Sequence, residues 1–295
     1  MTQLGLGTVQ FGMPYGISNQ RGQTSRDELA AILALAMRSG IHFLDTATLY
    51  GDSESALGAA LSPTHPFCIV TKAPDFGPAT DTGRDAIKLT QTFERSLANL
   101  RQQKVYGLLV HNADDLLRPG ADAVWQAMRE LRTQGLVEKI GASVYTAAQI
   151  DFVLAHFDPT LIQVPVNIVD QRLIQSGHLS KLKSRNIEIH ARSVFLQGLL
   201  LMRPQDMPHY FHQFEPELSN YTAFLARHGL SPLEGALSFM RHVEQVDVAL
   251  VGVSCRAQMQ ECIRAFHVAR KSITDFSAAA CHNEMLLNPA SWPGN

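Results

Sequence analysis

Cysteine is scarce in this sequence. The chain has four cysteines in 295 residues, and they are scattered without the close spacing that metal sites use: Cys68, Cys255, Cys262 and Cys281. Cys68 lies inside an apolar segment, which is typical of a buried, reduced thiol. A disulfide framework is therefore not expected, and no metal site is predicted.

The sequence also has little net charge and no long apolar run. Its formal net charge is −2, and lysine and arginine form no cluster, so we expect no nucleic-acid partner. No apolar segment is long enough to span a membrane, and no basic segment followed by apolar residues opens the chain. These absences predict a cytoplasmic protein without a membrane partner, and they leave the oligomeric state open.

A third absence concerns the glycine pattern G-x-G-x-x-G. Gly5 and Gly7 follow one another as that pattern requires, but the third glycine is missing at its proper spacing. A doubly wound open sheet, for which the pattern is typical, is therefore the less favoured of the two α/β architectures that the chain could adopt.

Eight short apolar segments alternate with amphipathic helical patterns along the chain. The 45% of hydrophobic and 18% of charged residues fit a globular protein with a large core. The segments recur about every 25 to 35 residues without a linker. The expected strands cover residues 4–9, 41–45, 67–72, 105–110, 139–144, 161–164, 187–191 and 246–251. This order predicts an α/β fold, a (β/α)8 TIM barrel, as a single domain over residues 1–295.

Three segments fall outside the regular alternation. The longest irregular stretch is expected at about 198–216, where prolines and aromatic residues are frequent. A last helix is expected at about 275–287, packed outside the barrel, and residues 289–295 are expected to form a loose tail.

Three consecutive strands end in a polar side chain or directly before one. Asp45 closes the second strand, Lys72 closes the third, and His111 follows the fourth, while Tyr50 lies on the loop after Asp45. Since the carboxyl ends of the strands converge on one face of a parallel barrel, these four side chains are expected to meet. Each of these residue types also occurs in structural roles, as a helix cap, a packed ring or a solvated charge. Four of them at successive strand ends favour a catalytic site.

The chemistry that these four groups could share is carbonyl reduction. We expect Lys72 to lower the pKa of Tyr50 from its ordinary value of about 10, and Asp45 to hold Lys72 in place. His111 would donate a hydrogen bond to the carbonyl oxygen, and Tyr50 would supply the proton. A lyase that forms a Schiff base on Lys72 is the competing hypothesis, although a neighbouring Asp45 would keep the lysine charged.

The segment Asp45-Thr46-Ala47-Thr48-Leu49-Tyr50-Gly51 resembles the D-x-A-x-x-Y-G motif of the aldo-keto reductase family. Thr71-Lys72 and Val110-His111 are similar to the two other catalytic motifs of that family, in the same order and spacing. The resemblance covers nearly the whole chain. It implies a (β/α)8 barrel that reduces aldehydes or ketones by hydride transfer from a nicotinamide cofactor, usually NADP(H), with NAD(H) as the alternative.

The resemblance also implies a set of cofactor contacts. Ser143 and Gln163 would hold the nicotinamide carboxamide, since a buried amide needs polar partners. The segment from Ser193 to Gly198 would wrap the pyrophosphate, and the segment after the last strand would bind the adenosine 2′-phosphate. In full, the expected cofactor contacts are Gly7, Thr8, Ser143, Gln163, Arg192, Ser193, Phe195, Gln197, Gly198, Gly252, Ser254, Arg256, Gln258 and Cys262.

At four of these positions or beside them, the chain departs from the family pattern. Val144 stands where the family has asparagine, Cys262 replaces the asparagine beside the adenine, and Gln258 falls near a common arginine. Arg192 stands where an aromatic residue most often stacks on the nicotinamide. The preference for NADP over NAD therefore depends mainly on Arg256 and Ser254.

Three roles are open for Arg192. Its planar guanidinium could stack on the nicotinamide as an aromatic ring does. It could instead face the substrate and bind an anionic group, or it could be solvated and have no role in the site.

The function that follows is the NADP(H)-dependent reduction of a small-molecule aldehyde or ketone to an alcohol, with Tyr50 as the general acid. Residues 7–12 with Tyr15-Gly16 faintly resemble bacterial family members that are found with polysaccharide or sugar-nucleotide genes, which suggests a sugar-related substrate. The alternative is a nicotinamide-binding regulatory or interaction subunit with little turnover.

Overall fold

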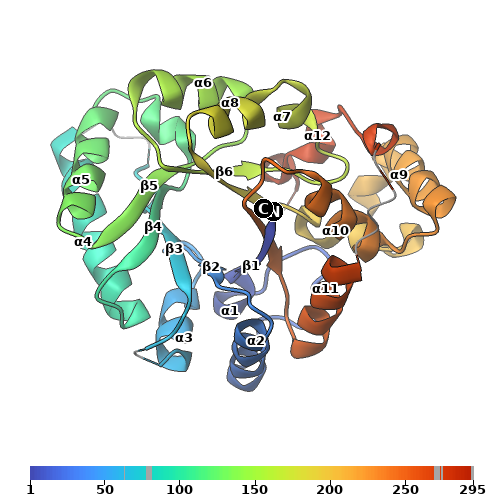
Figure 1. The fold of residues 1–295 in the computed structure, drawn as a ribbon, viewed down its shortest axis with the longest axis horizontal. Coiled ribbons are helices and arrows are strands. Elements are labelled where there is room, and N and C mark those ends of the chain that lie inside the picture. The colour runs from blue at the N-terminus through green and yellow to red at the C-terminus, as the bar shows by residue number, and fades with distance from the viewer. Residues whose placement is uncertain (63, 78–81, 269–272, 274, 294–295) are drawn as a thin grey trace.

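The computed structural model of the protein describes residues 1–62, 64–77, 82–268, 273 and 275–293. Its eight parallel strands pair in sequence order, and the first closes the ring against the last. They are β1 (Gln3–Gly7), β2 (Phe43–Asp45), β3 (Cys68–Lys72), β4 (Val105–Val110), β5 (Val137–Ser143), β6 (Leu161–Pro165), β7 (Glu188–Arg192) and β8 (Val248–Gly252). The predicted (β/α)8 barrel is confirmed. Figure 1 shows the strands at the centre of the molecule and the helices around them.

Helices alternate with the strands, and one helix after each strand belongs to the ring around the barrel. These helices are α2 (Arg26–Arg38), α3 (Ser53–Ala60), α4 (Thr82–Leu100), α5 (Ala121–Thr133), α6 (Ala147–His156), α8 (His178–Ser184), α10 (Pro232–His242) and α11 (Arg256–Val268). In α2 the side chain of Ser25 caps the first turn, and the buried residues Leu29, Ile32, Leu33 and Ala36 form the face that packs on the barrel. None of the helices in the described residues is long and apolar enough to cross a membrane.

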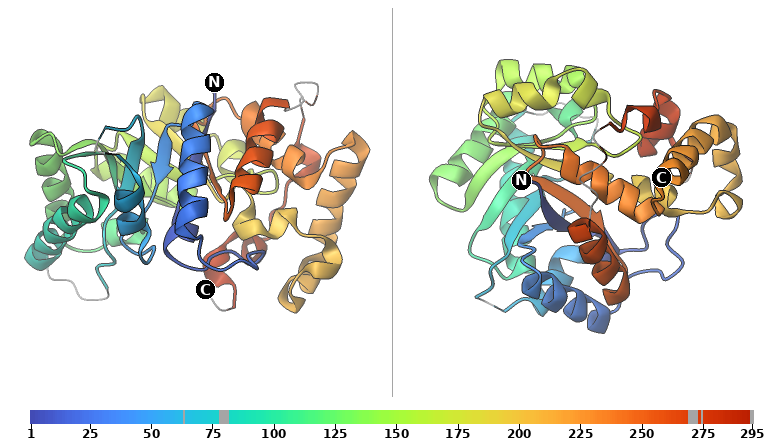
Figure 2. Two further views of the ribbon diagram at one scale, coloured as in Figure 1. Left: turned by 90° about the horizontal axis from the view of Figure 1, so that it is seen from below. Right: turned by 45° about the vertical axis from the view of Figure 1, so that its right-hand side comes forward.

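Further helices lie in several of the loops. They are α1 (Val9–Gly12), α7 (Arg172–Gln175), α9 (Glu215–His228), α12 (Glu284–Leu287) and the 3-10 helices η1 (Ala113–Leu116), η2 (Leu196–Leu201), η3 (Pro204–Asp206), η4 (His209–Phe214), η5 (Ser277–Ala279) and η6 (Pro289–Ser291). The longest of them is α9, with 14 residues. The first strand therefore ends at Gly7, and Val9 begins α1 instead of ending the strand. Figure 2 shows α9 (orange) outside the ring of barrel helices.

The centre of the barrel is filled by apolar side chains. Val70, Leu109 and Leu161 form a separate buried cluster between the strands, and Gly107 leaves them room, because a Cβ there would lie 3.1 Å from both Val70 and Leu161. Since alternate residues of a strand face the same side, Lys72 lies above Val70 and Cys68 below it on the inner face of β3. The cluster of Val70, Leu109 and Leu161 thus separates the two ends of the barrel.

Two expectations for the end of the chain are wrong. The expected helix at 275–287 is two short pieces, η5 and α12, because the backbone N–H of Cys281 is bonded to the carbonyl of Val169 at 2.8 Å and holds the stretch between them. Residues 289–293 are not loose either. Trp292 is 4% exposed, its indole N–H donates to Met285 O at 3.0 Å, and its ring meets Phe211 edge-on at 4.8 Å. Residues 294 and 295 of the expected tail lie outside the described residues.

Candidate active site

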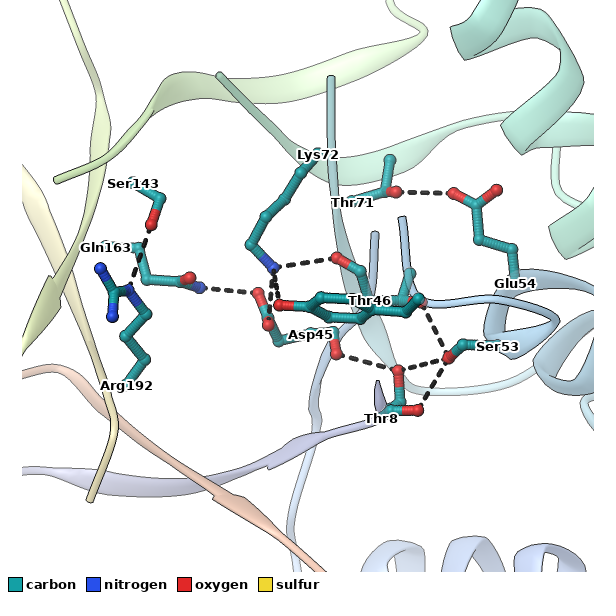
Figure 3. A network of polar contacts seen from close by, with 11 residues as sticks. Thr8, Asp45, Thr46, Ser53, Glu54, Thr71, Lys72, Ser143, Gln163 and Arg192 are labelled. Carbon is teal, nitrogen blue, oxygen red and sulfur yellow. Dashed lines mark hydrogen bonds and ion pairs between the residues drawn. The ribbon is translucent and has the colours of Figure 1, made fainter. Parts of the chain in front are cut away.

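Lys72 is the centre of the polar cluster at the carboxyl end of the barrel. Its side chain is 1% exposed, and Nζ donates to Asp45 Oδ2 at 2.7 Å and to the carbonyl of Thr46 at 3.0 Å. Nζ also lies 3.4 Å from the hydroxyl of Tyr50. Figure 3 shows the lysine pointing from β3 toward Asp45 at the end of β2. The three side chains meet as the sequence predicts.

The loop that carries Tyr50 is fixed by close backbone packing. A Cβ on Gly12 would lie 1.8 Å from the carbonyl oxygen of Tyr50, so only glycine allows α1 to approach this loop so closely. Gly51 has φ of +53° and packs against Gly12 from the other side, and Asp52 N donates to Gly12 O at 3.3 Å. The tyrosine is thereby held at a fixed height above Asp45.

A second layer of hydroxyl groups supports the same strand ends. Thr8 Oγ1 donates to the carbonyl of Asp45 at 2.9 Å, and the buried hydroxyl of Ser53 contacts Thr8 and Thr46. Thr71 beside the lysine donates to Glu54 on α3 at 2.7 Å. Because every member of this layer is buried and bonded, the strand ends have little freedom to move.

His111 completes the cluster from the end of β4. Its ring meets that of Tyr50 edge-on, with the centroids 5.7 Å apart. Burial lowers the pKa of His111 to about 3, and the charges of Lys72 and Arg192 act in the same direction. The imidazole is therefore neutral at physiological pH, and its Nδ1 is buried without a partner in the described residues.

The expected effect of Lys72 on Tyr50 is not what the structure gives. Burial raises the pKa of Tyr50 above its ordinary value, the charge of Asp45 raises it further, and the charge of Arg192 opposes the change. Because Asp45 neutralises the ammonium group at 2.7 Å, the phenol faces an ion pair and not a free cation. Tyr50 thus keeps its proton over the whole physiological range.

Lys72 does not suit a Schiff-base role. Burial lowers the pKa of Lys72, and the charge and hydrogen bond of Asp45 offset this only in part, so the exclusion of a Schiff base depends on access to the amine. The amine is enclosed by its three oxygen neighbours and is absent from the walls of the adjacent cavity. A substrate carbonyl entering the cavity would therefore reach Tyr50 and not the lysine nitrogen.

A cavity of about 650 Å³ opens above the cluster. Its volume is in the range of small-molecule and cofactor sites. The walls include Asp45, Tyr50 and His111, together with the expected cofactor contacts Gly7, Thr8, Ser143, Gln163, Arg192, Ser193, Phe195, Gln197, Gly198, Gly252, Ser254, Gln258 and Cys262. Arg256 is the one expected contact that does not line it.

Gln163 and Ser143 have the unused polar atoms that a carboxamide needs. Gln163 Nε2 donates to Asp45 Oδ1 at 2.7 Å, while its Oε1 is buried without a partner and can accept an N–H. Ser143 Oγ accepts from Arg192 Nε at 3.2 Å, so its own proton remains available. The two residues therefore fit the amide group of a nicotinamide, as expected.

Arg192 is held in place by three hydrogen bonds, which excludes the solvated role. Besides Ser143, its guanidinium donates to Val144 O at 3.0 Å and to Ser193 Oγ at 3.3 Å. The guanidinium carbon also lies 4.0 Å from the centroid of the Tyr145 ring. Figure 3 shows Arg192 beside Ser143, on the far side of Gln163 from Lys72.

The far end of the cavity differs from the expected phosphate site. Arg256 is exposed, and its backbone N–H donates to the carboxylate of Glu28 at 2.6 Å. The backbone N–H of Ser254 donates to the side chain of Gln258 at 2.7 Å. Two backbone N–H groups at the start of α11 thus already have acceptors within the protein.

Several cavity residues were not expected from the sequence. Gln10 reaches the cavity from α1, Tyr15 and Ser18 from the loop after α1, Tyr145 from the segment after β5, and Glu261 from α11. Gln10 directly follows the expected strand at residues 4–9, and this position could have indicated that it lines the cavity. Nothing local in the sequence indicates that Glu28, in the first turn of α2, would bond to Arg256.

The comparisons with known proteins agree with this site. A family profile described as Aldo/keto reductase family matches residues 3–284. The chain is 23% identical over 304 residues to the uncharacterized oxidoreductase YqkF of Bacillus subtilis (strain 168), with 96% of this chain and 93% of the relative covered. It is 25% identical over 281 residues to L-galactose dehydrogenase of Arabidopsis thaliana, with 90% and 85% covered.

The fold is also similar to that of solved structures. The holo form of an aldo-keto reductase from Bacillus halodurans has a TM-score of 0.74 at 20% identity, over 99% of this chain and 94% of that one. A family match over nearly the whole chain, together with the cluster of Asp45, Lys72, Tyr50 and His111 beside a cavity, gives the assignment. The chain belongs to the aldo/keto reductase family and is a nicotinamide-dependent oxidoreductase.

Proposed function

We propose that the protein reduces an aldehyde or ketone to the alcohol with NADP(H), and that Tyr50 delivers the proton. The observation that carries this proposal is the contact of Tyr50 with the buried pair of Lys72 and Asp45 at the floor of the cavity. A barrel that only bound the cofactor would have no need for a buried ion pair behind an open phenol, because such pairs are costly to bury.

The residues divide the work of the reaction. The neutral imidazole of His111 and the phenol of Tyr50 bind the carbonyl oxygen, and the phenol gives up its proton as negative charge develops there. The phenolate that forms lies beside the ammonium group of Lys72, which Asp45 orients. The cofactor, when bound, supplies the hydride to the carbonyl carbon.

Three parts of the cavity would hold the cofactor. Ser143 and Gln163 bind the carboxamide through the free hydroxyl proton and the unpartnered Oε1. The residues from Ser193 to Gly198 contact the pyrophosphate, and Ser254, Gln258 and Cys262 line the adenosine end. We propose NADP(H) over NAD(H), with the side chains of Ser254 and Arg256 on the 2′-phosphate and Glu28 as a competing anion that weakens this contact.

We further propose that the carbonyl substrate is related to a sugar. One relative is named L-galactose dehydrogenase, and the rings of Tyr15, Tyr50 and Tyr145 line the cavity. Aromatic rings that carry a hydroxyl offer an apolar face and a polar edge together, which suits a ligand with both C–H and O–H groups.

The test is a panel of aldehydes, ketones and sugars with NADPH and with NADH, followed as loss of nicotinamide absorbance. We expect turnover with NADPH that depends on the carbonyl compound. Tight cofactor binding without turnover on any of them would instead support a regulatory or interaction subunit.

A further inference from the structure

Arg192 is a cation without a carboxylate partner at the wall of the active-site cavity. Its three protein acceptors are two hydroxyl groups and a carbonyl, and no acidic side chain in the described part of the chain pairs with it. The nearby carboxylate of Asp45 is already bonded to Lys72 and Gln163. The catalytic end of the cavity therefore carries one net positive charge.

The position of this charge is fixed. The hydrogen bonds to Ser143 and Val144 tie one edge of the guanidinium to the end of β5, and Tyr145 covers one of its faces. A planar cation held along an edge and on one face cannot turn away without losing several contacts at once. We therefore expect the guanidinium to keep this position when a ligand enters the cavity.

Arg192 is directly bonded to one of the groups proposed to hold the nicotinamide. Ser143 accepts from Arg192, and Gln163, which has the unpartnered acceptor, is paired with Ser143 in the sheet. The charge also acts on the reacting groups, because it lowers the pKa of His111 and opposes the rise in the pKa of Tyr50. A nicotinamide ring held by Ser143 and Gln163 would therefore also be close to the positive charge of Arg192.

We propose that Arg192 makes this site discriminate between the two oxidation states of the cofactor, binding the reduced form more tightly than the oxidised form. The nicotinamide ring is positively charged when oxidised and neutral when reduced, so the fixed cation repels only the oxidised ring. This inference rests on the proposed function and deepens it by favouring the reductive direction. The equilibrium constant of the catalysed reaction is unchanged. At equal concentrations of the two cofactor forms, however, the site binds mostly the reduced form, whereas a site without this charge would bind the two forms about equally.

The expected size of the effect is that of one unit charge beside a charged ring. A fixed unit charge a few ångströms from a charged ring changes the ratio of the two dissociation constants by about tenfold or more. A tenfold ratio corresponds to a change of about 30 mV in the potential of the bound two-electron couple.

The experiment measures the dissociation constants of NADPH and NADP⁺ for the full chain, by fluorescence titration and calorimetry. The variants are Arg192→Gln, which removes the charge, and Arg192→Lys, which keeps it. Arg203→Gln is the matched control, because Arg203 is 73% exposed, pairs with Asp206 and does not line the cavity. Circular dichroism and thermal unfolding establish that each variant is folded, and Arg192→Met replaces Arg192→Gln if the latter is not.

We expect wild type, Arg192→Lys and Arg203→Gln to bind NADPH at least about tenfold more tightly than NADP⁺. In Arg192→Gln the ratio should fall toward one, mainly through tighter binding of NADP⁺. If wild type binds the two cofactor forms equally tightly, the inference is wrong. It is also wrong if Arg192→Gln has the same ratio of dissociation constants as wild type. If neither cofactor form binds, the proposed function itself fails.

The substrate-anion role of Arg192 is distinguished with 4-formylbenzoate and its methyl ester. If Arg192→Gln raises KM for the acid alone and leaves the ratio of cofactor dissociation constants unchanged, Arg192 recognises the substrate and the inference is wrong. Equal KM changes for acid and ester, together with the expected fall in the ratio, support it.

Discussion

The two ends of this barrel each hold an ionic cluster, part-buried at the amino end and buried around Lys72 and Asp45 at the carboxyl end, and the two clusters differ in which polar groups lack a partner. At the amino end, Glu188 accepts from His190 at 2.7 Å and from Tyr106 at 2.6 Å, and it lies 3.0 Å from the ammonium group of Lys139. At the carboxyl end, Asp45 is paired as closely with Lys72. Only the carboxyl-end cluster borders the cavity described above.

The difference lies in the partners and not in the residue types. Both clusters contain a carboxylate, a lysine, a tyrosine and a histidine. At the amino end the hydroxyl of Tyr106 donates its proton to the carboxylate of Glu188, so this proton is not available to a ligand. At the carboxyl end the hydroxyl of Tyr50 accepts from Lys72, and its own proton has no acceptor in the described residues. The same four residue types are bonded to one another at the amino end, whereas at the carboxyl end one hydroxyl proton is left without an acceptor, and this is the proton that the proposed reaction uses.

The largest expected effect comes from Tyr50→Phe, which removes that proton and keeps the ring. Turnover should fall by ~10²–10⁴, the usual contribution of a general acid, while folding and NADPH binding stay normal. Steady-state rates and a fluorescence titration measure the two quantities. Retention of more than about a tenth of the wild-type rate would remove Tyr50 from the proposed role.

Lys72→Met should break the carboxyl-end cluster in both activity and stability. Asp45 would be buried without its cation, which typically costs about 3–5 kcal/mol in the free energy of unfolding, and turnover should fall by roughly 10²-fold. Denaturant unfolding and steady-state kinetics measure both.

The double variant Asp45→Asn with Lys72→Met is the control for this prediction. It should recover most of the stability, because no charge is left unpaired, but none of the activity. If the residual activity of Lys72→Met had the same pH profile as wild type, Lys72 would not be coupled to the proton donor.

At the rim of the carboxyl end, Arg256→Ala and Glu28→Gln should change cofactor affinity in opposite directions. Loss of the arginine should weaken NADPH by about tenfold and leave NADH nearly unchanged, as expected for a charge-assisted contact. Loss of the carboxylate that occupies the Arg256 N–H should tighten NADPH by a few fold, also with little change for NADH. Equal effects on both cofactors would exclude a 2′-phosphate site here.

The smallest effect on catalysis is expected at the amino end, for Glu188→Gln. Although burial alone would raise the pKa of Glu188, hydrogen bonds from His190 and Tyr106 lower it from 4.5 to about 2. The stabilising contribution is thus complete above about pH 4.5 and disappears as the pH falls through about 2. Activity at neutral pH should stay near that of wild type, while stability between pH 2 and 4.5 should depend less on pH than in wild type. A large loss of turnover would show that the two ends are coupled.

The sequence predicts which residues meet at the carboxyl end, because a parallel barrel brings its strand ends together whatever lies between them. That argument sufficed for Asp45 with Lys72 and for Ser143 with Gln163. It could not predict the direction of the pKa change of Tyr50, which depends on the 2.7 Å contact that neutralises Lys72. Nor could it predict that Glu28 would bond to Arg256, 228 residues away, or that Trp292 would dock on Phe211. These contacts join side chains from elements whose relative placement no local pattern encodes.

The loop after β1 has a kinetic consequence. Ile17 N donates to Gln197 O at 3.0 Å, and a Cβ on Gly198 would lie 1.9 Å from Ser18 Oγ, so the loop touches η2 where both line the cavity. A long ligand that extends past this contact cannot enter or leave freely while the contact persists. Release of such a ligand would require both the hydrogen bond of Ile17 and the packing of Ser18 on Gly198 to separate, so we expect loop movement, and not the chemistry, to limit turnover.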